Sequence, residues 1–183
     1  MYLKKIEIHL TDNFLQKTII KMGIIVSYEV IKDLNLIIEI ENNKNSNFNI
    51  ETFLNQNRAE IKSFSTFVKS WNPLYSLLGN ISGNNIFDKL SEYKSSIESN
   101  EYTKIFTIDE VSILYEILKG INDKEIKISI ENSLLRTKIA RENGYNMKYI
   151  FDENSIYTEF VELKNAVNFA YVSESLIVQI LYP

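Results

Sequence analysis

The sequence predicts an α+β fold, with residues 1–183 forming one domain in which several helices pack against a small mixed or antiparallel sheet. Three observations lead to this prediction. Apolar residues alternate near the N-terminus, they recur at helical spacing before the C-terminus, and the chain closes with an apolar run at residues 176–182. A chain of 183 residues has the usual size of one domain and can bury a core without disulfides. The sheet is expected to combine an N-terminal strand, a hairpin and the C-terminal strand.

The first forty residues predict three strands and one short helix. Residues 2–10 alternate between apolar and polar, as a half-buried strand does, and residues 14–22 predict a short helix after several capping residues. Two β-rich runs follow at residues 24–31 and 34–41. Because only two residues separate these runs, they predict a β-hairpin. Its outward side is expected to carry three carboxylates, those of Glu29, Glu39 and Glu41.

The middle of the chain predicts helices separated by turn residues. Apolar spacing over residues 50–69 indicates a helix, either continuous or broken near Ser63, and Asn49 can cap it. A proline then opens a short helix at residues 73–78, because proline is tolerated in the first turn. The polar, glycine-containing residues 81–85 predict a turn. Residues 86–99 predict a weaker amphipathic helix.

A helix start is clearest before residues 107–119. Thr107 and Glu110 have the spacing of a capping box, in which each side chain accepts a hydrogen bond from the backbone of the other residue. Residues 122–142 are ambiguous, since their isoleucines first alternate as in a strand and the later apolar residues have helical spacing. We expect a helix over residues 122–142.

The C-terminal segment predicts the principal core unit. Residues 154–172 place an apolar residue every three or four positions, which predicts an amphipathic helix. A short polar link separates this helix from the strand at residues 176–182. Glu159 and Glu162 flank the apolar stripe and are expected to face solvent.

Composition excludes several functional classes. The chain has no cysteine, so it can form neither disulfides nor thiolate metal sites, as is typical of a protein in a reducing cytosol. A net charge of −4 argues against nucleic-acid binding, which depends on concentrated lysine and arginine. Charged residues interrupt the apolar positions of the N-terminus, so no signal peptide is expected. No run approaches the ~20 apolar residues that span a membrane. We therefore expect a cytoplasmic protein without a membrane partner.

Four segments share their order and spacing with a known family. Residues 106–118 look like a "threonine/serine-x-acid-acid-Val" helix, and residues 157–182 give a helix followed by an apolar strand that ends in tyrosine. Residues 70–79 contain a tryptophan helix that ends in Leu-Leu-Gly, and residues 22–25 look like the usual start. These segments resemble the YfbM-like family of small, functionally uncharacterised bacterial proteins. The positions of the motifs extend the resemblance over about two-thirds of the chain. The resemblance implies an α+β fold and no established reaction. A glycine-rich loop of that family is missing, since residues 91–103 contain no glycine.

Reactive side chains are few and scattered. His9 is the single histidine, so it has no second histidine for a metal site and no evident catalytic partner. The acidic pairs at 109–110 and 152–153 lie where predicted helices begin, and the helix dipole there favours capping over catalysis. The basic residues Arg136, Lys138 and Arg141 have Glu131 and Glu142 beside them and no aromatic residue between them, so they predict a solvated helix face rather than a nucleic-acid contact. No glycine-rich phosphate loop occurs. We expect no catalytic residue, no metal and no cofactor.

These features favour a non-enzymatic protein-binding domain, and a bacterial immunity or inhibitor protein that sequesters a basic toxin or effector fits them best. Surface carboxylates would steer a basic partner. Trp71 either packs in the core, which the large area that aromatic rings bury favours, or anchors the partner. Two alternatives remain open: an enzyme of unfamiliar type that acts through carboxylates and tyrosines in a cleft, and a self-associating structural subunit. The residues predicted to bind the partner are Glu29, Glu39, Glu41, Trp71, Asp152 and Glu153.

Overall fold

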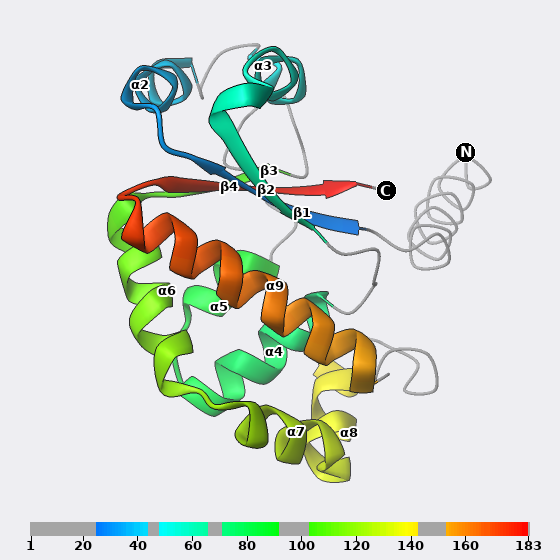
Figure 1. The fold of residues 1–183 in the computed structure, drawn as a ribbon. Coiled ribbons are helices and arrows are strands. Elements are labelled where there is room, and N and C mark those ends of the chain that lie inside the picture. Colours follow the sequence, from blue (N-terminus) through cyan, green and yellow to red (C-terminus); the bar gives the residue numbers. More distant parts are fainter. Residues whose placement is uncertain (1–24, 44–47, 66–70, 92–102, 143–152, 183) are drawn as a thin grey trace, which may run out of the picture.

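The computed structural model describes residues 25–43, 48–65, 71–91, 103–142 and 153–182, and these form an α+β fold (Figure 1). The predicted strand at 2–10, the helix at 14–22 and His9 lie outside the described residues. The antiparallel sheet has the strand order β2-β1-β4-β3. Its strands are β1 (Ile25–Ile31), β2 (Ile61–Ser65), β3 (Thr103–Phe106) and β4 (Leu176–Tyr182). The predicted C-terminal strand is confirmed, and it occupies a central position.

Helices cover both faces of the sheet, as Figure 1 shows. One face carries α2 (Leu34–Asn43) and α3 (Ile50–Gln56). The other face carries α4 (Trp71–Ser82), α5 (Ile86–Ser91), α6 (Ile108–Gly120), α7 (Asp123–Glu131), α8 (Ser133–Glu142) and α9 (Glu153–Val172). Successive side chains of a strand point to opposite faces, so β4 contributes to two separate cores. This double burial explains why β4 is an almost unbroken apolar run.

The predicted hairpin over residues 24–31 and 34–41 is wrong, because the second run is helix α2. Asp33 begins that helix, since its carboxylate accepts hydrogen bonds from the backbone N–H groups of Asn35 (2.8 Å) and Leu36 (3.1 Å). Ile40 on the inner side of α2 is fully buried against the sheet. Strand β1 pairs instead with β2 and β4, which come later in the chain.

The helix predicted over residues 50–69, with a break near Ser63 left open, is wrong over residues 58–65, and residues 66–69 lie outside the described residues. Asn49 caps α3 as predicted, with its side chain accepting from Thr52 N–H at 2.9 Å. The helix ends early because both the backbone and the side-chain amide of Asn57 donate to the carbonyl of Phe53. The chain then turns through a 3-10 helix at Arg58–Glu60 and continues as β2.

The second half follows the prediction more closely. The capping box is confirmed: Glu110 N–H donates to Thr107 Oγ1 at 3.3 Å, and Thr107 N–H donates to the Glu110 carboxylate at 3.0 Å. The helix expected over residues 122–142 is divided at Asn132. Its backbone N–H donates to carbonyl groups in the last turn of α7, and its side-chain oxygen accepts hydrogen bonds from the first turn of α8. The C-terminal helix is confirmed as α9.

The first helix on this side of the sheet is longer than predicted. The short helix predicted at residues 73–78 is part of the longer helix α4. Pro73 lies in the first turn of α4, where its missing N–H costs no helical hydrogen bond. Gly83 ends α4 with a φ of +65° and donates its N–H to the carbonyl of Gly79 at 2.9 Å. Strand β3, by contrast, has no counterpart among the predicted elements.

Candidate functional site

The structure does not gather the six predicted partner-binding residues into one site. Glu39 and Glu41 lie on α2, whereas Trp71 and Glu153 begin helices on the other side of the sheet. Asp152 lies outside the described residues. A continuous binding surface made of all six is therefore not supported by the fold.

Glu29 is not an outward-facing carboxylate, as the hairpin prediction required. It is only 3% exposed, because α2 and α3 cover the sheet face to which it points. Its carboxylate accepts hydrogen bonds from Ser27 Oγ (2.6 Å), from Ser63 Oγ and from Arg58 Nη1 (2.7 Å). Three donors, one of them cationic, satisfy this buried charge. Glu29 thus joins β1 to β2 and is removed from the candidate contact surface.

A second buried polar cluster lies on the opposite sheet face and was not predicted. It joins Tyr28 of β1, Tyr75 of α4, Glu159 of α9 and Gln179 of β4, each at most 1% exposed. Gln179 Nε2 donates to Tyr75 Oη at 3.0 Å, the two tyrosine hydroxyls are hydrogen-bonded, and Tyr28 Oη donates to Glu159 Oε1 at 3.0 Å. With Tyr75 donating to Tyr28, every donor in this chain points toward the carboxylate. Glu159 is therefore part of the core, and the expectation that it faces solvent is wrong.

Burial determines the chemistry of these two tyrosines. It raises the pKa of Tyr28 well above its ordinary value, and the neighbouring Tyr75 and Glu159 raise this pKa further. Burial likewise raises the pKa of Tyr75, with Glu159 adding to the effect. Both hydroxyls are therefore neutral near pH 7 and serve as hydrogen-bond donors. Since all four side chains of the cluster are closed off from solvent, this arrangement fits a core network better than a reaction centre.

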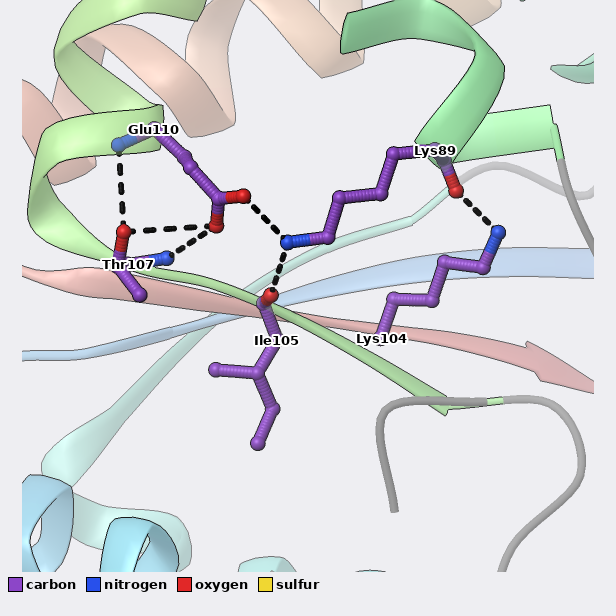
Figure 2. Close-up of polar contacts among 5 residues, drawn as sticks. All are labelled: Lys89, Lys104, Ile105, Thr107 and Glu110. Carbon is purple, nitrogen blue, oxygen red and sulfur yellow. Dashed lines mark hydrogen bonds and ion pairs between the residues drawn. The ribbon is translucent and has the colours of Figure 1, made fainter. Parts of the chain in front are cut away.

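A third polar cluster joins α5 and α6 to strand β3 (Figure 2). Lys89 Nζ donates to Glu110 Oε1 at 2.6 Å and to the carbonyl of Ile105 at 3.0 Å. The nearly buried Lys104 of β3 donates to the backbone carbonyl of Lys89 in the last turn of α5, where a cation complements the helix dipole. Glu110 thus serves the capping box and the ion pair together. The cluster joins α5, β3 and α6 and holds no side chain without a structural role.

The surface of α2 and α3 has a composition of its own. These two helices contain three carboxylates, those of Glu39, Glu41 and Glu51, and neither helix contains a lysine or arginine. Glu39 and Glu51 are exposed, and Glu41 is half-buried. Two large apolar side chains also face outward on α2: Leu34 is 65% exposed and Ile38 is 48% exposed. We name this set of five residues the acidic helical surface.

The comparisons with known proteins give no further guide. No family model, no curated protein and no solved structure matches this chain. The resemblance to the YfbM-like family stays a prediction. Among the residues that the structure describes, no group of three histidine or acidic side chains could hold a metal ion, and no helix there is long and apolar enough to cross a membrane.

Sequence reasoning missed the buried clusters because they join distant positions. Tyr28 and Glu159 are 131 residues apart, and no local pattern indicates that they meet. One signal was present: Glu159 directly precedes Phe160 of the apolar stripe, so it lies within about 100° of the buried direction on the helix. A carboxylate next to an apolar stripe can be buried when the core contains hydrogen-bond donors for it.

Proposed function

We propose that this protein is a protein-binding domain of the immunity or inhibitor type, which sequesters a basic toxin or effector in the bacterial cytoplasm. The observation that carries the proposal is the acidic helical surface, which combines exposed carboxylates with Leu34 and Ile38 and includes no basic residue from α2 or α3. A basic partner with apolar side chains at its centre complements this surface.

The two kinds of side chain would contribute differently to binding. Carboxylates accelerate the encounter with a basic protein through long-range attraction, and salt weakens this effect. Burying an exposed leucine or isoleucine gives short-range affinity, roughly 25 cal/mol for each Å² of apolar surface removed from water. Leu34 and Ile38 are one helical turn apart, so a single partner groove can cover both. The proposal thus predicts an association rate that depends strongly on salt.

An affinity capture from the native host at low and moderate salt tests the proposal. The expected result is one stoichiometric basic protein, retained more strongly at low salt. If no protein partner is recovered in stoichiometric amount at either salt concentration, the proposal fails.

A pair of charge-reversed variants then locates the binding surface. Glu39→Lys/Glu51→Lys reverses two exposed charges of the acidic helical surface, and the association rate should fall at least tenfold. Glu116→Lys/Glu131→Lys makes the same change of net charge on α6 and α7, across the sheet, and should change the rate much less. Equal losses in both variants would show that net charge, rather than this surface, governs binding.

A further inference from the structure

The buried cluster of Tyr28, Tyr75, Glu159 and Gln179 contains a hydrogen-bond chain that can run in either direction. Its contacts lead from Gln179 on β4 through Tyr75 on α4 and Tyr28 on β1 to Glu159 on α9. A tyrosine hydroxyl both donates and accepts, a glutamine amide has a donor end and an acceptor end, and a carboxyl group donates once it is protonated. Each of the four groups can therefore take either role toward its neighbour.

The direction described above suits an ionised Glu159. Gln179 Nε2 donates to Tyr75 Oη, Tyr75 donates to Tyr28, and Tyr28 donates to Glu159 Oε1. The other end of the amide takes no part, since Gln179 Oε1 is buried and has no hydrogen-bond partner among the described residues. This chain thus leaves an acceptor in reserve at its β4 end.

A protonated Glu159 gives the opposite direction. Its carboxyl group donates to Tyr28 Oη, Tyr28 then donates to Tyr75 Oη, and Tyr75 needs an acceptor on Gln179. A half-turn of the Gln179 amide places Oε1 toward Tyr75 in the position of Nε2, because the two ends of the amide have almost the same shape. One proton enters from solvent, the two hydroxyl hydrogens and the amide turn, and no proton passes from one of the four groups to another.

The proton on Glu159 decides between the two directions. In each direction one end of the Gln179 amide is bonded to Tyr75 and the other end is not, so the amide favours neither direction strongly. Two opposing effects act on the carboxyl group of Glu159, which is fully buried. Loss of water disfavours its charged form, and the hydrogen bond from Tyr28 stabilises that form.

The surroundings of Glu159 leave this choice to its own carboxyl group. Tyr28 of β1 and Tyr75 of α4 are titratable groups that face it, and burial raises the pKa of both well above the ordinary value, so both keep their protons while Glu159 titrates. Glu29, the other titratable residue on β1 beside Tyr28, points to the opposite sheet face. Charged side chains that the structure describes on β2, α6 and α7, which also pack against α9, are at least partly exposed. Helix α4 contains no charged residue, and neither does β4.

We infer that this cluster is a proton-dependent switch within the core: uptake of one proton by Glu159 on α9 reverses the hydrogen-bond chain and turns the side-chain amide of Gln179 on β4. A change of charge on a helix is thereby transmitted to a central strand through one residue of α4 and one of β1. The switch is independent of the acidic helical surface, which lies on α2 and α3.

A pH titration of the wild-type protein followed by NMR is the first test. The carboxyl carbon signal of Glu159 reports its proton, and the side-chain amide signals of Gln179 report which end of the amide faces Tyr75. Between about pH 4 and pH 9 both sets of signals should shift with one shared midpoint. If Glu159 does not titrate in the folded protein over this range, or if the Gln179 signals stay constant while it titrates, the inference is wrong.

Tyr28→Phe tests whether the hydrogen-bond chain carries the effect. It removes a hydroxyl between the two ends, so Glu159 should still titrate and the Gln179 signals should no longer follow it. Tyr157→Phe is the matched control, because it removes a surface hydroxyl that donates to Asp123, and the shared midpoint should be kept.

Tyr75→Phe interrupts the chain at its other hydroxyl and should uncouple the same two signals. Circular dichroism establishes that each variant is folded before its titration is compared with the wild type. A shared midpoint that survives in a folded Tyr28→Phe or Tyr75→Phe variant would show a general effect of pH and would contradict the inference. None of these measurements depends on whether a toxin or effector is ever found.

Discussion

Tyr28→Phe removes one oxygen from the buried cluster and leaves the ring in place. The lost hydroxyl donates to Glu159 Oε1 at 3.0 Å and is hydrogen-bonded to Tyr75 Oη. A hydrogen bond to a charged group contributes about 1.5–3 kcal/mol, and a buried donor left without its acceptor adds to the cost. We expect the free energy of unfolding to fall by about 2–3 kcal/mol. For a domain of this size, about 2–4 °C per kcal/mol gives a melting temperature lower by about 4–12 °C.

Tyr157→Phe is the matched control for this prediction. It removes the same atom from a hydroxyl that donates to Asp123 at 2.7 Å on the surface, where water can replace the lost bond. Urea unfolding followed by circular dichroism should show a clearly smaller change for Tyr157→Phe than for Tyr28→Phe. Adding Tyr75→Phe completes a double-mutant cycle, in which the two core changes should be non-additive. Equal effects of Tyr28→Phe and Tyr157→Phe, or additive core changes, would refute the network as described.

Four further predictions follow from local contacts. Burial raises the pKa of Tyr28 and of Tyr75, so above about pH 10 these two tyrosines keep protons in the folded protein that they lose in the unfolded chain. The free energy of unfolding should therefore fall by up to about 1.4 kcal/mol per pH unit for each tyrosine. In Tyr28→Phe, the urea midpoint should fall less steeply with pH than in the wild type. Glu174 has a φ of 50° where α9 ends, so Glu174→Gly should raise stability by up to about 1 kcal/mol in urea unfolding. Lys89→Met should lower stability by about 1 kcal/mol in the same assay, because it removes the half-buried ion pair with Glu110 and keeps the stem. Arg58→Met should lower the free energy of unfolding in urea by about 1–2 kcal/mol at low salt and by less at high salt, since it removes the cation paired with buried Glu29.

The elements that could be predicted from sequence are those fixed by neighbouring residues. Thr107 and Glu110 specify a helix start through contacts three residues apart, and both hydrogen bonds are present. Helix α9 is likewise defined by its own apolar stripe, and β4 by a run that is buried on both sheet faces. Local chemistry determines these elements, so a local pattern predicts them.

The α2 segment shows why other elements could not be predicted. Asp33 suits a hairpin turn and a helix N-cap equally well, and the isoleucines of residues 34–41 favour a strand by intrinsic preference. What decides the outcome is that β2, from much later in the chain, occupies the place beside β1. Tertiary pairing therefore overrides the local preference. The wrong hairpin prediction also placed Glu29 on the exposed side of the sheet, because the exposure of Glu29 depends on whether a helix covers that face.

The two buried carboxylates give the strand register a physical cause. Tyr28 and Glu29 are neighbours on β1, so they point to opposite faces, where Glu159 and Arg58 respectively meet them. A slip of β1 by one residue would turn Glu29 toward Glu159 and leave both buried carboxyl groups without their present donors, which is far more costly than an apolar mismatch. The buried carboxyl groups of Glu29 and Glu159 thus help to fix the register of β1. Exposed carboxylates remain on α2 and α3, and these two helices contain no lysine or arginine.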